Sequence, residues 1–324
     1  MSADKKASPA SGKESFEAEM AKLEQLVDSL ESGKVSLDDD IGKYFPDMPR
    51  YERPITVRHL LTHTSGLGYG FTSATVRDFK PKPGDSFEVG PLLFDPGTQW
   101  LYGTSTDWVG RLVEAVSGED LETYFRSHIT GPLGMADTAF NLPAAAQARL
   151  VNNWQRSPAG DLSERPRQAT QPVTAFNGGG GLSSTATDYM TFVRMILNDG
   201  QDRAGTGKTT RILSAASVAE MSRNQMGAVS ARALKSAQPT QSADFSFIRD
   251  GRDKWGLGFL ISTAPPPGRR SAGSLSWGGI NNTYFWIDRT KGIGGVIMMQ
   301  FLPFADPHAL ALYDAFEAAV YAGR

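Results

Sequence analysis

The chain has 324 residues, and 40% of them are hydrophobic, which is enough to bury a sizeable core. The 33 basic and 35 acidic residues leave a net charge of −2, which argues against nucleic-acid binding through a broad basic surface. Cysteine is absent, so the sequence excludes disulfides, thiol nucleophiles and thiolate metal sites.

Targeting and metal-binding patterns are also lacking in the sequence. No apolar run is long enough to span a bilayer, and the first fifteen residues lack the apolar core of a signal peptide. The four histidines (His59, His63, His128 and His308) show no metal-ligand spacing, and we expect packed or surface imidazoles. The sequence therefore predicts a cytoplasmic protein without metal, cofactor, nucleic-acid partner or membrane contact.

The N-terminal part begins with a polar tail, residues 1–14, which we expect to be disordered. An amphipathic helix is predicted next, at Ser15–Leu37, because its apolar residues recur at three- and four-residue steps. Ser15 is placed to cap the start of this helix, and Gly33 is placed to end it.

The middle of the chain alternates predicted helices with loops that are rich in proline and polar residues. Periodicity and capping residues predict helices at about 56–62, 106–116 and 120–129, from 184 or 185 onward, and near 214–224. The segment 70–99 is predicted to be rich in loops, the segment 143–176 to be irregular, and the polar segment 228–250 to be mobile.

The C-terminal part is rich in predicted strands. The four candidates are WGLGFLIS (255–262), GSLSWGGI (273–280), TYFWIDRT (283–290) and GIGGVIMMQ (292–300). Residues Asp288–Gly292 are predicted to form a hairpin connection, and a final helix is predicted at about Pro307–Ala322. Helices followed by antiparallel strands indicate an α+β protein.

Six stretches carry a family resemblance by their order and spacing. They are VSLDDDIGKYFPD, ITVRHLLTHTSGLG, FDPGTQWLYGTSTDWVGRLVEAVSG, GPLGMADTAF, GGGGLSSTATDYMTFVRMILNDG and SWGGINNTYFWIDR. From about residue 34 to its end, the chain resembles the serine β-lactamase fold, closest to class C β-lactamases and family VIII carboxylesterases.

The resemblance implies an α+β, β-lactamase/transpeptidase-like fold of the kind found in penicillin-binding proteins. It consists of an antiparallel sheet flanked by helices, plus a helical subdomain. In this chain the resemblance divides residues 38–324 into a helical part, at about 38–250, and a sheet with a final helix, at about 251–324. Two strands that the family places before its nucleophile helix have no counterpart, so we expect the sheet to lack its N-terminal strands.

The resemblance also implies a mechanism. In the family, the serine of an S-x-x-K motif attacks an ester or β-lactam carbonyl, and the lysine and a tyrosine handle the proton. Tyr102 stands at the position of that tyrosine, as the base, and Gly103-Thr104 after it fits the esterase-like branch. A tyrosine with an ordinary pKa near 10 needs a cationic neighbour for this role. The alternative is that Tyr102 only packs with Trp100 and Trp108.

The W-G-G stretch, Trp277-Gly278-Gly279, stands where β-lactamases carry K-T-G. By resemblance these three residues bind substrate, and the Ile280 N–H donates to the oxyanion. Because the family's lysine is lost, the resemblance favours neutral esters over penicillins. The alternative is a bulged hairpin strand without a binding role.

The family's nucleophile is missing from its expected position. Counted back from Gly33, the serine position falls on Phe16 and the lysine position on Glu19, and neither side chain can do that chemistry. Ser15 is a weak nucleophile candidate, because Lys22 would lie two turns away, about 10 Å along the helix. We favour the N-cap role for Ser15.

Other apparent motifs are set aside. The S-x-x-K of Ser2 and Lys5 lies in the polar tail and is ascribed to chance. Ser65, in HTSG, is expected to be structural, since it is not in a G-x-S-x-G elbow. Residues 205–209, GTGKT, resemble only half of a P-loop, and a phosphate site is not expected there.

The N-terminal helix has a resemblance of its own. SFEAEMAKLEQLVDSLESGKVSLDDDI resembles the N-terminal half of the exonuclease VII small subunit, a helical partner of a nuclease. The sequence therefore predicts a chimera, natural or engineered, with its junction near Gly33–Asp39.

Three functional hypotheses follow. The first is a serine hydrolase of the esterase branch, which would act on a small ester or β-lactam but is impaired by the missing dyad. The second is a catalytically inactive chimeric scaffold or oligomerising module, and the third is a nuclease accessory subunit. Because the strand at 292–300 would have an uncovered edge, we also expect a homo-oligomer, through that edge or the N-terminal helix.

Overall fold

The computed structural model describes residues 35–46, 48, 51–80, 90–165, 172–202 and 209–323. Ser15, Phe16 and Glu19 lie outside these residues, as do the polar tail and nearly all of the predicted N-terminal helix. The inferences drawn on them stay predictions. In the described ranges, no helix is long and apolar enough to cross a membrane.

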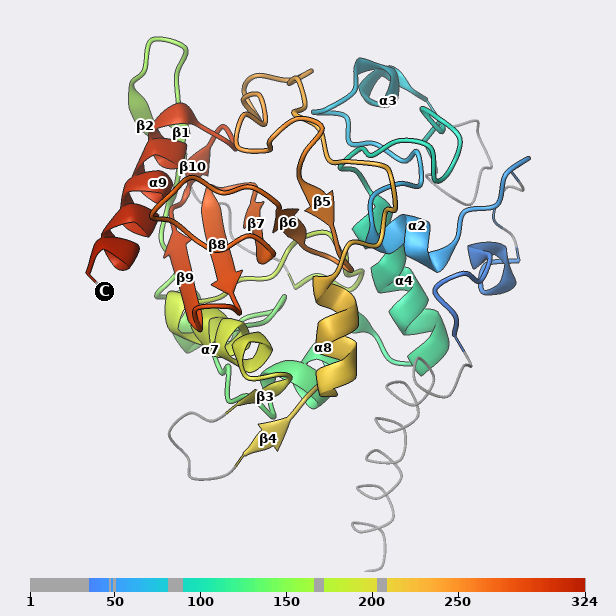
Figure 1. The fold of residues 1–324 in the computed structure, drawn as a ribbon, viewed down its shortest axis with the longest axis horizontal. Coiled ribbons are helices and arrows are strands. Elements are labelled where there is room, and N and C mark those ends of the chain that lie inside the picture. Colours follow the sequence, from blue (N-terminus) through green and yellow to red (C-terminus); the bar gives the residue numbers. More distant parts are fainter. Residues whose placement is uncertain are drawn as a thin grey trace, which may run out of the picture.

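Most of the described helices lie in the first two thirds of the chain, where they alternate with irregular segments, and α9 follows the strands of the main sheet (Figure 1). They are η1 (Ile41–Lys43), α2 (Val57–Leu61), α3 (Ala74–Asp78), α4 (Ser105–Ser117), α5 (Leu121–Phe125), the π-helix η2 (Arg126–Thr130), α6 (Ala144–Gln147), α7 (Ala186–Leu197), α8 (Ala215–Ser222) and α9 (Pro307–Ala322). Side-chain caps explain several starts: Thr56, Asp120, Thr185 and Ser214 each accept a hydrogen bond from a first-turn N–H.

The main sheet is antiparallel and has the order β5-β6-β7-β8-β9. Its strands are β5 (Lys254–Trp255), β6 (Leu260–Ser262), β7 (Ser274–Gly279), β8 (Thr283–Asp288) and β9 (Ile293–Met298). A second sheet has the order β10-β1-β2, from β1 (Asn153–Arg156), β2 (Leu162–Arg165) and β10 (Phe301–Leu302), and β3 (Gln201–Asp202) pairs with β4 (Thr210–Arg211). The main sheet matches the expected α+β fold, and within the described part of the chain no strand that precedes β5 belongs to it.

Two adjacent glycines of β9 show how helices cover the two faces of the main sheet. A Cβ on Gly294 would lie 2.4 Å from Val193 Cγ1 of α7, so this face packs on α7. A Cβ on Gly295 would lie 2.0 Å from the Trp286 ring, and that ring packs against Phe316 of α9 at 5.3 Å between centroids. Because successive side-chain positions in a strand point to opposite faces, α7 and α9 enclose the sheet between them.

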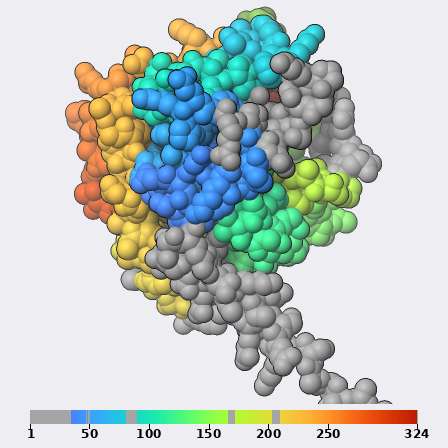
Figure 2. Space-filling view, turned by 90° about the vertical axis from the view of Figure 1, so that its right-hand side faces the viewer, coloured from blue at the N-terminus to red at the C-terminus, as the bar shows by residue number. Residues whose placement is uncertain are grey.

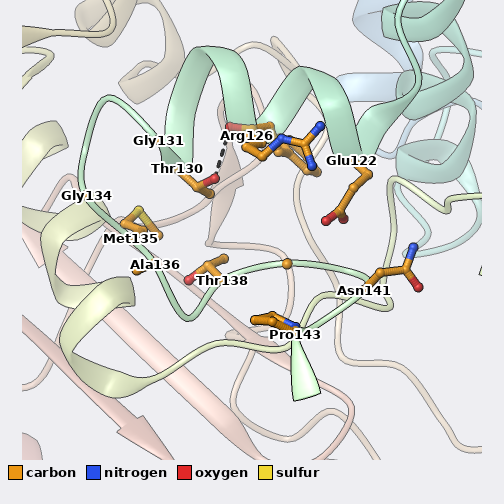
Figure 3. Close-up of a pocket in the computed structure, with 12 residues that line it drawn as sticks. Glu122, Arg126, Thr130, Gly131, Gly134, Met135, Ala136, Thr138, Asn141 and Pro143 are labelled. Carbon is orange, nitrogen blue, oxygen red and sulfur yellow. Dashed lines mark hydrogen bonds between the residues drawn. The ribbon is translucent and has the colours of Figure 1, made fainter. Parts of the chain in front are cut away.

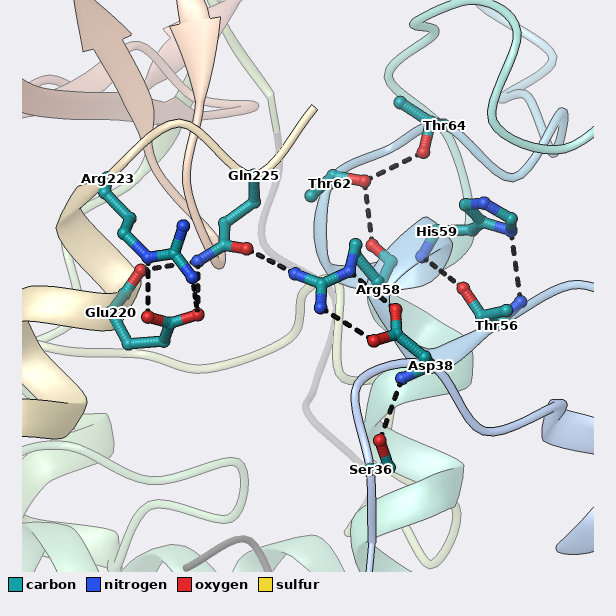
Figure 4. A network of polar contacts seen from close by, with 10 residues as sticks. All are labelled: Ser36, Asp38, Thr56, Arg58, His59, Thr62, Thr64, Glu220, Arg223 and Gln225. Atoms are coloured by element: carbon teal, nitrogen blue, oxygen red, sulfur yellow. Dashed lines mark hydrogen bonds and ion pairs between the residues drawn. The ribbon is translucent and has the colours of Figure 1, made fainter. Parts of the chain in front are cut away.

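A polar network around Arg58 joins α2 to α8 within the helical part (Figure 4). Arg58, on α2, donates to both carboxylate oxygens of Asp38, at 2.8 and 3.1 Å, and also to Gln225 Oε1. Gln225 Nε2 donates in turn to Glu220 of α8 at 2.9 Å. The space-filling view shows the same neighbours, because the blue segment near residue 50 lies against the gold residues that follow residue 210 (Figure 2).

Most predicted elements are confirmed with small shifts of their boundaries. The final helix has the predicted bounds, α4 ends at Gly118 with φ of 74°, and Asp288 pairs with Ile293 across the predicted hairpin. The predicted helix at 120–129 is also present, but its second half is the π-helix η2.

Three local predictions are wrong. The stretch WGLGFLIS is not one strand, because Gly256 N–H donates to Phe259 O in a turn that separates β5 from β6. The segment 143–176 is not wholly irregular, since it contains β1 and β2. The segment 228–250 has no helix or strand, but it buries Ala231, Phe245 and Ile248 in the core, which contradicts the expectation of a mobile segment.

Candidate active site

The loop that carries Tyr102 is fixed against the HTSG segment. Leu101 N–H donates to His63 O at 2.9 Å, and Gly103 N–H lies 3.5 Å from His63 Nδ1. A Cβ on Gly103 would lie 2.0 Å from Leu67 O, so the position after the tyrosine admits only glycine. These contacts hold Tyr102 against the HTSG segment, a few residues before α4 begins.

Tyr102 lies in a cluster of aromatic rings. Its ring centroid is 4.8 Å from His63, 4.8 Å from Trp277 and 5.3 Å from Tyr69. Trp277 in turn contacts Trp255 at 4.6 Å. The structure therefore brings together Tyr102 and Trp277, which the sequence predicted for one site. Trp277 is also a tryptophan that the packing alternative for Tyr102 did not name.

Burial sets the protonation of this cluster. It lowers the pKa of His63 to about 3, so the ring is neutral at physiological pH. Burial also raises the pKa of Tyr102, whereas a hydrogen bond from the Trp277 side chain lowers it and the Asp107 carboxylate raises it. Since no lysine or arginine acts on it, the Tyr102 hydroxyl is protonated at neutral pH, and its role as a base remains a prediction.

The second half of β7 has an open edge beside this cluster. β6 pairs with β7 only from Ser274 to Ser276, so Trp277, Gly278 and Gly279 extend beyond it. β8 pairs with every residue of this half in regular register, and the alternative of a bulged strand is therefore wrong. The Ile280 side chain is 44% exposed in the turn that follows, so its backbone lies at the surface.

The two glycines of β7 also have a packing role. A Cβ on Gly278 would lie 2.6 Å from the Tyr284 ring, and a Cβ on Gly279 would lie 2.4 Å from Thr283 Oγ1. β8 therefore excludes larger side chains at both positions, and this holds whether or not a substrate binds at the other edge of β7.

Ser65 is structural, as its sequence context predicted. Its side chain is completely buried, its hydroxyl lies 2.7 Å from Ser105 Oγ, and its Oγ accepts from Leu67 N–H at 3.1 Å. A hydroxyl enclosed in this way is not accessible to substrate.

Three tryptophans around Tyr102, of which Trp100 and Trp255 are buried and Trp277 is partly buried, have poorly satisfied donors. Within the described residues the indole N–H groups of all three lack an acceptor in good hydrogen-bond geometry, and that of Trp277 acts on the Tyr102 hydroxyl. A buried donor without an acceptor costs about 1–3 kcal/mol, so such groups are uncommon in folded proteins. Sequence reasoning placed Trp277 here but missed the concentration of unsatisfied donors, since no motif indicates which residue pairs with an indole.

A hollow of about 460 Å³ lies apart from this cluster, between the α5–η2 helix and the loop 131–143 (Figure 3). Its two threonine hydroxyls already donate, Thr130 to Phe125 O and Thr138 to Asp188 Oδ2. No histidine, lysine or serine lines it. The hollow therefore lacks a nucleophile with a base, and the described residues contain no cluster that could hold a metal ion.

Comparison with known proteins places the chain in a family. The family model described as Beta-lactamase matches residues 26–320. The chain belongs to the Beta-lactamase family. The match begins at residue 26, inside the predicted N-terminal helix, whereas the motifs indicated a start at about residue 34.

Characterised relatives of this Beta-lactamase family member act on acyl groups, as their names state. An acyltransferase calJ of Penicillium decumbens is 30% identical over 92% of this chain and 77% of its own length. A lovastatin esterase of Penicillium rubens is 29% identical over 90% of this chain and 80% of its own length. The structure of a simvastatin synthase (LovD) mutant from Aspergillus terreus is similar with a TM-score of 0.72 and 28% identity, over 94% of this chain and 80% of that one.

Proposed function

We propose that this Beta-lactamase family member binds neutral acyl esters between Tyr102 and the open half of β7, and that its turnover is impaired. Acyl transfer and ester hydrolysis are the chemistry of its named relatives. The observation that carries the proposal is the Trp277 indole N–H, which is buried, has no acceptor in good hydrogen-bond geometry among the described residues, and acts on the neighbouring Tyr102 hydroxyl.

An ester suits this surface for two reasons. Its carbonyl oxygen is an acceptor, so it can satisfy a donor that is otherwise unpaired. Its apolar acyl and alcohol groups match the aromatic rings of Tyr69 and Trp277, which are partly exposed. In this proposal the Ile280 N–H, next to Gly279 in the turn, supplies the oxyanion donor.

A neutral ester is favoured over a β-lactam carboxylate because, among the described residues, no lysine or arginine acts on Tyr102. The lysine nearest to it in sequence, Lys254, donates instead to Val229 O at 2.7 Å and to Ser230 Oγ at 3.0 Å. Its ammonium therefore holds the loop 227–230, and Trp277 stands where β-lactamases carry a lysine.

Impaired turnover follows from two features. The raised pKa of Tyr102 keeps its hydroxyl protonated, and Phe16 and Glu19 occupy the sequence positions of the family's serine and lysine. Loss of the nucleophile costs serine hydrolases about 10⁶-fold in kcat, and binding with the oxyanion hole leaves about 10³-fold over water. We expect a residual rate in that lower range.

Hydrolysis of p-nitrophenyl butyrate by the full chain tests the proposal. We expect a rate above buffer by about 10³-fold at most, a loss of this rate in Tyr102→Phe, and no loss in the control Tyr189→Phe, which removes the hydroxyl of a partly buried tyrosine on α7. The hydrolysis rate of Ser15→Ala decides whether this serine contributes as a nucleophile: a lower rate would show that it does, and an unchanged rate that it does not.

Two outcomes would contradict the proposal. A rate equal to that of buffer, without ester-dependent quenching of tryptophan fluorescence, would favour an inactive scaffold. Faster hydrolysis of nitrocefin than of the butyrate ester would show that β-lactams are the substrate class.

The origin of residues 15–37 from an exonuclease VII small subunit-like helix also remains a proposal. It is supported by the S-F-E start and the L-E-x-L-V-x-x-L-E-S-G run. In such a chimera the helix supplies packing or partner contacts, and the acyl chemistry belongs to the Beta-lactamase part.

A further inference from the structure

β9 is the last strand of the main sheet and has an open outer edge. It pairs with β8 through all six residues, and within the described part of the chain no strand pairs with its other side. Met299 N–H donates to Asn282 O, so odd-numbered residues face β8. Since the direction of backbone groups alternates in an antiparallel strand, Gly294, Val296 and Met298 direct their N–H and C=O groups outward.

This edge lacks the features that usually protect an edge strand from association. Protected edges carry charges, prolines or bulges, or they are very short. From Gly292 to Gln300 the sequence has no charge and no proline, and the register with β8 shows no bulge. By contrast, β2, the edge strand of the second sheet, is fully exposed and carries Glu164 and Arg165.

α9 extends the unprotected edge into a wider apolar surface. The helix lies at the same side of the molecule as β9 (Figure 1), and Leu310 and Tyr313 share a hydrophobic cluster with Ile297 of β9. Its exposed residues include four alanines and Leu312, which is 52% exposed, together with His308 and with Asp314, which pairs with Arg269. The exposed side of α9 is therefore mixed, and the alanines with Leu312 form its apolar part.

The first 34 residues of the chain are poorly suited to cover this edge. Their length is sufficient to reach it, but their apolar residues recur at helical spacing, and the polar tail contains Pro9 and three lysines. A strand that completes a sheet would instead need alternating or continuous β-branched and apolar residues. A second copy of β9 meets this requirement.

We propose that two copies of this chain form a dimer through antiparallel pairing of β9 with β9, flanked by α9. A two-fold axis lets the same backbone groups of both strands satisfy one another. No charged side chain lies within either strand, and the net charge of −2 gives little repulsion between the copies.

Light scattering coupled to size-exclusion chromatography tests the dimer. We expect the full chain to have twice the mass of one copy, which is 35.0 kDa. Met298→Lys places an ammonium on the unprotected edge, so this variant should be a folded monomer by circular dichroism and scattering. The control Val151→Lys changes a side chain that is 68% exposed and distant from β9 in sequence, and it should stay dimeric.

Hydrogen exchange provides a measurement that needs no substitution. The amides of Gly294, Val296 and Met298 should exchange slowly at high protein concentration and faster on dilution. The proposal is overturned by a monomeric full chain at about 50 μM, by a dimeric Met298→Lys variant, or by edge amides that exchange rapidly at every concentration. Loss of the dimer in Leu23→Glu together with rapid edge exchange would assign the interface to the N-terminal helix instead.

Discussion

Two buried clusters of the molecule combine aromatic rings with polar groups, and they differ in how well those groups are satisfied. Near α9, Arg270 donates to both oxygens of Glu317 and to the Tyr313 hydroxyl, which itself donates to Phe285 O. Around Tyr102, the indole N–H groups of three tryptophans have no acceptor in good hydrogen-bond geometry among the described residues. We infer that the first cluster stabilises the fold, whereas the second retains binding capacity for a ligand.

The largest expected effect comes from breaking the Arg270 cluster. Glu317→Gln leaves the Arg270 guanidinium, whose side chain is 9% exposed, without its counter-charge. Such a loss costs about 3–5 kcal/mol in free energy of unfolding, measured by urea denaturation. The matched double variant Arg270→Met/Glu317→Leu should recover most of this loss, and a Glu317→Gln protein as stable as the wild type would refute the structural role.

A smaller effect is expected from the pH dependence of the Tyr102 cluster. The pKa of His63 is about 3 in the folded state and near 6.5 when unfolded, so only the unfolded chain gains a proton as the pH falls below 6.5. The resulting stability is present above pH 6.5 and is lost toward pH 3. Between pH 7 and pH 5 this amounts to about 2 kcal/mol.

Urea denaturation at both pH values measures this contribution of His63. His63→Asn, which tolerates the local φ of 55°, should remove it, whereas the exposed control His308→Asn should keep it. An unchanged pH dependence in His63→Asn would show that other groups cause it.

The smallest effect is expected at the unsatisfied indoles. Trp277→Phe removes a buried donor without an acceptor, which offsets the burial lost with the smaller ring, so the free energy of unfolding should change by less than about 1 kcal/mol. Ester-dependent fluorescence quenching should nevertheless weaken. Trp286→Phe is the matched control, because its indole N–H donates to Tyr321 Oη at 3.2 Å, and it should be clearly destabilised. Equal destabilisation of both variants would remove the distinction between the clusters.

Local sequence signals predicted those elements whose cause is local. The cap at Thr56, the left-handed Gly118 and the apolar spacing of Pro307–Ala322 each lie within a few residues of the feature that they specify. The hairpin of β1 and β2 was missed because its apolar residues, Trp154 and Leu162, are exposed and produce no alternating pattern.

The candidate site was predictable only where a motif spans it. The family motifs indicated Tyr102 and Trp277, and the structure brings their rings to 4.8 Å. Phe245, which also packs there, lies in a polar segment whose burial depends on distant partners. The pKa of Tyr102 was equally hidden, because burial determines it and the sequence around the residue does not.

The hydrogen bond from Arg58 to Gln225 has a consequence for the order of folding. It joins residues that are 167 positions apart, so the chain must lose the conformational entropy of closing that loop before the contact can form. Contacts of this kind tend to form after the transition state, and their loss accelerates unfolding more than it slows folding. Arg58 thus helps to set the lifetime of the native state, because it keeps Asp38 and Gln225 attached to α2.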